Sequence, residues 1–325
     1  MQRLAKGKNM GYFGSVRFFK NMILLAVIVM IAVPTGLSVH LGQSLRQAEQ
    51  RLQTLESEVN GLSEEPGDLS EDVSQEENPS KRTSEVSAMS SFQAESPYAD
   101  LYPDFYAPQA LCANTRETGV IYLTFDDGPS ERTKEILDTL KEKDVKATFF
   151  VIGCRSEESK AILRRIVEEG HTLAMHSYSH NYANIYASVE DYLADMYQLF
   201  VQIRDETGVA PTLFRFPGGS INGYSSGIYQ ELIAEMMRRG FVPFDWNISS
   251  EDAATNGLVP TDRLVNNVLS GAAKVQRGVV LMHDSEPKTT TSAALGTIID
   301  RLRDMNFELK ALTPEVMPVL YSYQN

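Results

Sequence analysis

Short apolar, β-branched segments alternate with longer amphipathic segments from about residue 100 to the C-terminus. This alternation constrains the fold most, because repeated strand–helix units form a parallel sheet with helical crossovers. It fits either an α/β barrel slightly smaller than eight units or an open sheet. Seven strands are predicted, at Val120–Phe125, Ala147–Ile152, Thr172–Met175, Leu213–Phe216, Phe241–Asp245, Val279–Met282 and Phe307–Leu312. Six helices are predicted between them, at 131–143, 157–169, 188–206, 226–239, 261–275 and 290–304.

The N-terminal part of the chain has a different composition. Residues 22–42 contain no Asp, Glu, Lys or Arg, and they are about long enough to cross a bilayer core as a helix. Five basic residues and no acidic one precede them, so the positive-inside rule places residues 1–21 in the cytoplasm. We therefore expect a single-pass transmembrane anchor at 22–42, with the rest of the chain on the extracytoplasmic side. A cleaved signal peptide is the alternative.

Residues 43–99 are predicted to be a stalk and an acidic disordered linker. The first part, 44–62, has the apolar spacing of a short amphipathic helix, which would be either a weak coiled coil or a solvated stalk. The second part, 63–98, is rich in Ser, Glu and Pro, and it has too few large apolar side chains to offset its chain entropy. The folded domain is then expected at 100–325.

Charge and cysteine content limit the partners and the covalent structure. The formal net charge is −13, which argues against nucleic acid as a partner because phosphate binding needs a basic surface. The acidic domain instead suits a neutral or cationic substrate. The two cysteines, Cys112 and Cys154, are too few for a disulfide framework. They form either one bridge or two buried thiols, and the sequence leaves both open.

Two clusters of polar residues follow predicted strands near the start of the domain, at the sheet edge where α/β proteins form active sites. Asp126 and Asp127 close the first strand before a Gly-Pro turn, where they are either catalytic or a helix cap. His176 and His180 follow the third strand, four residues apart, which is a common spacing for zinc ligands. With a carboxylate from another strand end, these histidines predict a metal site. His171 lies at the opposite end of its strand and is interpreted as structural.

Two further clusters follow later strands. Arg215 ends a strand and is costly to bury unless a carboxylate pairs with it, and the Pro-Gly-Gly turn after it allows a ligand to approach the backbone. The alternative is an exposed turn with a surface arginine. His283 ends the Val279–Met282 strand and is a general acid/base candidate, because a nearby Asp would fix its tautomer and raise its pKa. Trp246, the only tryptophan, packs either on a sugar or in the core.

Together, these clusters resemble the motifs of the polysaccharide deacetylase family, also called carbohydrate esterase family 4 or the NodB-homology domain. The resemblance covers roughly residues 118–315. TFDDGP at 124–129, HSYSH at 176–180 and LMH at 281–283 match the first, second and fifth motifs of the family. RFPGGS at 215–220 matches the third motif in its Arg, its Pro and its second Gly. The resemblance implies a distorted (β/α)7 barrel with the active site at the C-terminal ends of the strands.

The resemblance also implies roles for individual residues. It implies that Asp126 is the general base, oriented by Arg215, and that His283 is the general acid, oriented by Asp252. It implies that a divalent metal, usually Zn²⁺, is bound by Asp127, His176 and His180.

For the substrate, the resemblance implies that Leu281 lines the pocket for the acetyl methyl group and that the backbone N–H near Gly218 stabilises an oxyanion. Two positions depart from the family pattern. The family often has an aromatic residue where Gly218 stands, so the substrate rim is expected to differ. The fourth motif usually reads Asp-Trp, whereas Ala253 follows Asp252. Trp246 is the candidate to fill that space.

The expected activity is metal-dependent hydrolysis of N-acetyl groups from an extracytoplasmic polysaccharide, with release of acetate. A membrane anchor and an external domain favour peptidoglycan amino sugars as the substrate. Chitin-like polymers and exported polysaccharides remain open. A non-catalytic wall-binding module with the same fold is the alternative of a different class.

Overall fold

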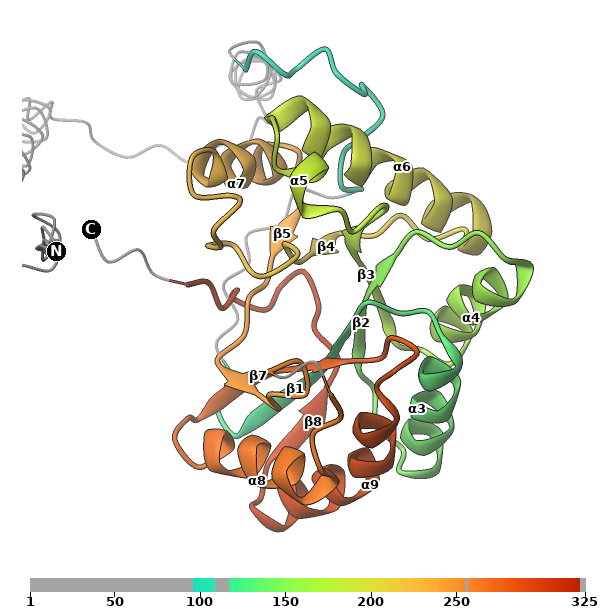
Figure 1. The fold of residues 1–325 in the computed structure, drawn as a ribbon, viewed down its shortest axis with the longest axis vertical. Coiled ribbons are helices and arrows are strands. Elements are labelled where there is room, and N and C mark those ends of the chain that lie inside the picture. Colours follow the sequence, from blue (N-terminus) through green and yellow to red (C-terminus); the bar gives the residue numbers. More distant parts are fainter. Residues whose placement is uncertain (1–95, 109–116, 255–256, 322–325) are drawn as a thin grey trace, which may run out of the picture. The chain divides into compact units, whose positions relative to one another are not determined.

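The computed structural model describes residues 96–108, 117–254 and 257–321 of the 325-residue chain. Its centre is one sheet of eight parallel strands in the order β5-β4-β3-β2-β1-β7-β6, with β8 paired to β1 (Figure 1). The bounds are β1 Val120–Asp126, β2 Thr148–Ile152, β3 Thr172–Ser177, β4 Leu213–Phe214, β5 Val242–Pro243, β6 Ile248–Ser249, β7 Arg277–His283 and β8 Glu308–Lys310. This arrangement confirms the predicted α/β class, because every pairing is parallel.

The sheet curls into a half-barrel, and in the described part of the chain its end strands β5 and β6 each have a single partner. Strand β1 is the central strand. It pairs with β7 along its whole length, while its other edge pairs first with β8 at Val120–Tyr122 and then with β2 at Thr124–Asp126. The prediction missed β6. A two-residue strand is too short to show a periodic pattern.

Helices cover the convex face of the sheet (Figure 1). Each predicted helix is present with its ends at most three residues from the predicted ones, and the short helix α5 after β3 was not predicted. The bounds are α3 Glu131–Glu142, α4 Glu157–Glu168, α5 Tyr182–Ile185, α6 Val189–Thr207, α7 Tyr229–Arg238, α8 Thr261–Ala272 and α9 Thr289–Asp304. Ser130 caps α3 by accepting a hydrogen bond from the Arg132 N–H, and it thereby fixes where the loop after β1 ends.

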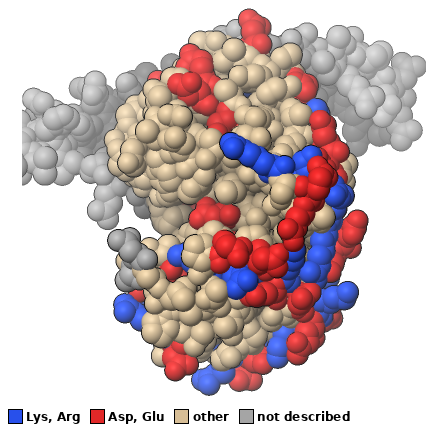
Figure 2. Space-filling view, turned by 45° about the vertical axis from the view of Figure 1, so that its right-hand side comes forward, with Lys and Arg blue, Asp and Glu red and all other residues tan. Residues whose placement is uncertain are grey.

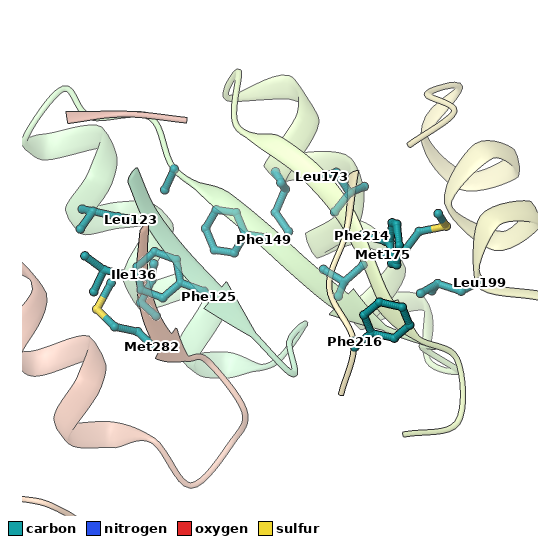
Figure 3. Close-up of a cluster of buried hydrophobic side chains, with 14 of the residues drawn as sticks. Leu123, Phe125, Ile136, Phe149, Leu173, Met175, Leu199, Phe214, Phe216 and Met282 are labelled. Atoms are coloured by element: carbon teal, nitrogen blue, oxygen red, sulfur yellow. The ribbon is translucent and has the colours of Figure 1, made fainter. Parts of the chain in front are cut away.

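The strand pleat separates two sets of buried side chains. Ile121, Leu123 and Phe125 point outward from β1 into the core beneath the helices, where Phe125 stacks on Phe149 at 5.2 Å (Figure 3). The alternate residues Val120 and Tyr122 belong to a smaller apolar cluster on the concave face. The same alternation brings Thr124 and Asp126 to the concave face at the carboxyl end of the strand.

Ion pairs link the outer surfaces of neighbouring helices. Lys134 of α3 pairs with Glu158 of α4, and Lys160 of α4 pairs with Glu206 of α6. Lys143, which directly follows α3, pairs with Asp300 of α9. Figure 2 shows this intermixing of acidic and basic side chains along one side of the molecule. These exposed pairs contribute little stability each, so burial of the sheet and helices dominates.

The segment before β1 is held by a buried arginine. Arg239, at the end of α7, donates hydrogen bonds to the carbonyls of Tyr98, Leu101, Tyr102 and Phe105. Its guanidinium also pairs with Glu235 at 2.7 Å. The folded domain therefore includes residues 96–99, which the sequence assigned to the linker.

The predicted cytoplasmic segment 1–21, the anchor at 22–42 and the linker up to residue 95 lie outside the described residues. Within the described ranges, none of the helices is both long and apolar enough to cross a membrane. Cys112 also lies outside them. Cys154 is a buried thiol 3.6 Å from the Gln202 Oε1 atom, and burial raises its pKa to about 11.

Candidate active site

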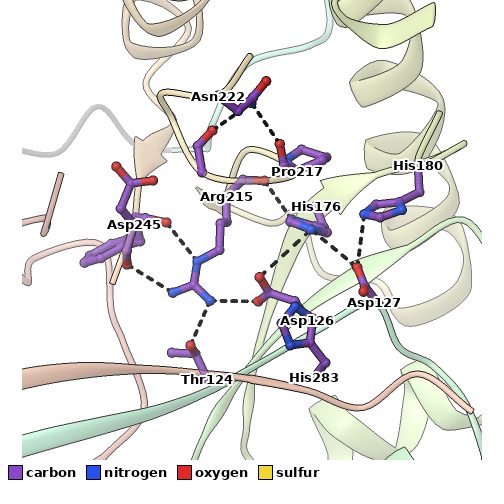
Figure 4. A network of polar contacts seen from close by, with 12 residues as sticks. Thr124, Asp126, Asp127, His176, His180, Arg215, Pro217, Asn222, Asp245 and His283 are labelled. Carbon is purple, nitrogen blue, oxygen red and sulfur yellow. Dashed lines mark hydrogen bonds and ion pairs between the residues drawn. The ribbon is translucent and has the colours of Figure 1, made fainter. Parts of the chain in front are cut away.

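The predicted site residues meet at the carboxyl edge of the sheet (Figure 4). Asp126, His176 and His283 lie at or near the C-terminal ends of β1, β3 and β7. Asp126 and His283 are direct register partners in neighbouring strands. His171 lies at the opposite end of β3, where its Nδ1 accepts a hydrogen bond from the Ala147 N–H.

Asp127, His176 and His180 form a cluster that fits a divalent cation. One ligand atom from each lies within 4.8 Å of the others. The Asp127 Oδ1 atom is 3.5 Å from His176 Nε2 and 3.1 Å from His180 Nε2. Two imidazole nitrogens and one carboxylate are a common donor set for zinc and similar ions, and three protein ligands leave a position for water or substrate.

The protonation state of the cluster suits this use. His176 Nδ1 is 2.9 Å from the Arg215 carbonyl, which accepts a hydrogen bond from it and leaves Nε2 free to face Asp127. Burial lowers the pKa of His176, so its ring is neutral at pH 7. Burial alone would raise the pKa of Asp127, but the neighbouring His180 and His176 hold it well below its usual range. Asp127 is therefore an ionised ligand.

A strand end and a turn, rather than one helical turn, present the two histidines. His176 is in β3, and His180 is in the following turn with a φ of 51°. Asp195 of α6 shapes this turn by accepting hydrogen bonds from the Ser177 hydroxyl and from the Tyr178 and Ser179 N–H groups at 2.7–2.8 Å. Sequence reasoning missed Asp195, because a carboxylate inside an amphipathic helix looks like an ordinary surface residue.

Arg215 is fully buried and pairs with the Asp126 carboxylate at 2.7 Å. The same guanidinium donates to the Thr124 hydroxyl and to the carbonyls of Phe244 and Asp245, and it lies over the Phe150 ring at 4.1 Å. These contacts offset the cost of burying the charge and fix one carboxylate oxygen. The other oxygen, Oδ2, lies 3.9 Å from His176 Nε2 and so faces the metal cluster.

The partly buried His283 and the buried Asp252 form a second pair. The Asp252 Oδ1 atom is 2.8 Å from His283 Nδ1, and Oδ2 accepts from the His283 N–H and the Thr291 hydroxyl. Burial alone would lower the pKa of His283, but the hydrogen bond and charge of Asp252 raise it to about 9. The absence of a Trp after Asp252 therefore does not displace this carboxylate from His283.

The predicted substrate residues surround these groups. Leu281 is inward-facing on β7 and 8% exposed, and Gly218 is exposed in the loop after β4. Trp246 is half-buried, edge-on to Tyr321 at 5.1 Å. Asp245, the neighbour of Trp246, holds the loop after β4 by accepting from the Ser220 backbone and hydroxyl.

Asp284 is a further buried carboxyl that sequence reasoning left without a role. Its Oδ2 accepts a hydrogen bond from the Thr133 hydroxyl at 2.5 Å, and its N–H donates to the Asp126 carbonyl. Burial raises the pKa of Asp284 to about 7. Asp284 ties the end of β7 to the loop that follows β1.

A parallel half-barrel with a cation cluster, a paired carboxylate and a paired histidine at one edge defines an α/β protein equipped for hydrolysis. The family model described as polysaccharide deacetylase matches residues 113–237. A peptidoglycan-N-acetylglucosamine deacetylase of Bacillus cereus is 38% identical over 217 residues, which are 65% of this chain and 76% of that protein. The putative polysaccharide deacetylase YheN of Bacillus subtilis is 33% identical, over 61% of this chain and 69% of that one.

A solved structure agrees with these sequence matches. The catalytic domain of a peptidoglycan N-acetylglucosamine deacetylase from Eubacterium rectale superimposes with a TM-score of 0.62 at 34% identity. The match covers 67% of this chain and all of that domain. The chain therefore belongs to the polysaccharide deacetylase family, as its motifs indicated.

Proposed function

We propose that this protein is a metal-dependent hydrolase that removes N-acetyl groups from the amino sugars of peptidoglycan and releases acetate. One observation supports this most strongly. The cation cluster, the Asp126–Arg215 pair and the His283–Asp252 pair meet at the carboxyl edge of the sheet. The relatives named as peptidoglycan deacetylases support the choice of substrate.

The side chains suit an acid–base mechanism. Asp127, His176 and His180 would hold the cation, which when bound supplies Lewis acidity toward a carbonyl and water. Asp126, held by Arg215 on one oxygen, accepts the proton of the attacking water through the other. His283 gives its proton to the departing amine nitrogen, and Asp252 steadies the resulting imidazole. The N–H near Gly218 donates to the oxygen that becomes negative.

The remaining assignments extend this proposal. Zn²⁺ is the proposed metal, because two imidazoles and a carboxylate suit it. Leu281 would line the acetyl pocket, and Trp246 the adjoining wall. We infer that the fold is the distorted barrel of the family, with its seam between β5 and β6. Residues 22–42 are proposed to anchor the chain in the cell membrane, with residues 1–21 cytoplasmic and the catalytic domain outside.

The test is acetate release by the purified chain from peptidoglycan fragments and from N-acetylglucosamine oligomers, with and without a chelator. We expect release that the chelator abolishes and that added Zn²⁺ restores. A preference for chitin-type oligomers over peptidoglycan would change the proposed polymer. Tight glycan binding without acetate release, in the presence of bound metal, would instead indicate a non-catalytic wall-binding module.

The variant Asp126→Asn separates catalysis from metal binding. The amide keeps the shape of the side chain but cannot accept the proton of the attacking water, so we expect turnover to fall by about 10²–10⁴-fold. Bound metal, measured by elemental analysis, is expected to stay near the wild-type content. Activity close to wild type would show that another group is the base.

A further inference from the structure

At Gly218 the chain lacks the aromatic side chain that its family often has. Gly218 has a φ of +77°, and a Cβ added there would lie 3.0 Å from Cε1 of Tyr182 and 3.2 Å from its hydroxyl oxygen. A side chain at position 218 would therefore be strained by the backbone conformation and would crowd the Tyr182 ring. Tyr182, the first residue of α5, fills the space beside the loop after β4.

Tyr182 is one of a series of rings that leads from solvent to the metal cluster. Its ring is edge-on to His180, with centroids 5.4 Å apart and planes at 88°. On its other side it is edge-on to Tyr224, again at 5.4 Å, with planes at 63°. Tyr224 is 61% exposed, which is the largest exposed fraction among the exposed large hydrophobic side chains of the described residues.

The loop that presents Tyr224 is ordered by its own hydrogen bonds. Asn222 donates from its Nδ2 to the carbonyls of Pro217 and Gly219, and its Oδ1 accepts from the Tyr224 N–H (Figure 4 shows Asn222 beside Pro217). The part of the loop that contains the proposed oxyanion donor is thus tied to the part that presents the exposed ring. A ring held in this way binds a ligand at little further cost in conformational entropy.

We propose that Tyr182 and Tyr224 form an aromatic subsite for the sugar unit next to the one that is deacetylated. This inference rests on the proposed function. The C–H faces of a pyranose ring are apolar, and tyrosine offers an apolar ring with a polar tip that suits such a ligand. The subsite lies beside His180, so a glycan seated on it continues into the catalytic groups. It gives the protein a preference for oligomers over short substrates.

The test measures binding and turnover separately. Binding of an N-acetylglucosamine hexasaccharide is measured by calorimetry in the metal-loaded full chain with Asp126→Asn, which does not consume the ligand. Adding Tyr224→Ala is expected to weaken binding about tenfold, whereas Tyr224→Phe keeps the ring and stays within about twofold. Met237→Ala removes another exposed side chain, at the far end of α7, and is the control expected to bind normally.

Turnover gives the second readout. In the otherwise unmutated chain, Tyr224→Ala is expected to lower kcat/KM for the hexasaccharide about fivefold more than for monomeric N-acetylglucosamine, which has no neighbouring sugar unit, mainly through KM. The subsite would be overturned if adding Tyr224→Ala left the hexasaccharide affinity of Asp126→Asn unchanged. It would also be overturned if Asp126→Asn with Tyr224 intact did not bind the hexasaccharide. If the binding affinities change as expected but the unmutated protein releases no acetate from any glycan, the subsite is retained and the proposed activity is overturned.

Discussion

At the scale of single residues, the site depends on charged side chains that hold other groups in place. Asp252 fixes the tautomer of His283, Arg215 fixes one oxygen of Asp126, and Asp195 fixes the turn that contains His180. Motif spacing predicted the residues that would touch substrate and metal, because they follow strand ends. It could not predict Asp195, which is distant in sequence and reaches the site only through the packing of α6 against β3.

The pH dependence follows from His283, which must be protonated to act as the acid. Its pKa of about 9 keeps it protonated at neutral pH, and activity should fall as the pH rises through about 9. In Asp252→Asn the negative charge beside His283 is lost, while burial still lowers the pKa of His283. We therefore expect the alkaline limb of kcat to move to lower pH, with a reduced maximum. Profiles of kcat against pH for both proteins check this, and an unmoved limb would argue against His283 as the acid.

Asp195→Ala tests the support of the metal-ligand turn. Three hydrogen bonds to residues 177–179 disappear, so His180 is no longer held against Asp127. Loss of such an outer contact costs about 10–100-fold in metal affinity. Competition with a fluorescent chelator measures this affinity. Asp205→Ala, on the same helix and 62% exposed, is the matched control and should bind metal as wild type does.

At the scale of elements, the sequence predicted long segments well and short ones poorly. All six long helices appear near their predicted bounds, and seven strands appear at their predicted segments, although β4 and β5 have only two residues each. The strand β6 and the helix α5 have two and four residues, so neither contains a full repeat of its pattern. Their formation depends on tertiary partners, as when β6 pairs with β7.

The segment before β1 provides an element-scale prediction. Arg239→Ala removes hydrogen bonds to four carbonyls and leaves the buried Glu235 with fewer partners, so unfolding free energy should fall by about 3–5 kcal/mol. Urea unfolding followed by fluorescence of the only tryptophan, Trp246, measures the change. Arg263→Ala breaks an exposed pair at 3.7 Å and should change stability by about 0.5 kcal/mol or less. Equal losses of unfolding free energy in the two variants would contradict the role of Arg239 in holding the segment before β1.

At the scale of the whole molecule, the cation cluster joins β1, β3 and the turn after β3, so bound metal should stabilise the entire domain. At a free Zn²⁺ concentration about 100 times Kd, the expected gain is about 2.7 kcal/mol. Thermal unfolding with and without a chelator measures it. His180→Ala should abolish most of the gain, and a chelator-insensitive Tm in the wild type would show that the cluster binds no ion.

The alternation of strand-like and helix-like segments in the sequence predicted the parallel α/β class, but it did not predict whether the sheet closes into a barrel. Closure depends on the pairing of the end strands, and β5 and β6 are too short to reveal their partners by pattern. The order of strands likewise required the structure, since β1 lies between β2 and β7 although the latter is 150 residues away. Non-local pairing of this kind leaves no local signal.

The three partners of β1 imply an order of local opening. Backbone amides of β1 are held by β7 on one edge and by β8 and β2 on the other, so they open only when most of the domain unfolds. Amides of β5 and β6, each with one neighbouring strand, should exchange with solvent deuterium much sooner. Among the described residues, the strand that leads to Asp126 and Asp127 is thus expected to exchange most slowly. The loops at the carboxyl edge of the sheet can fluctuate around this strand without moving the carboxylates.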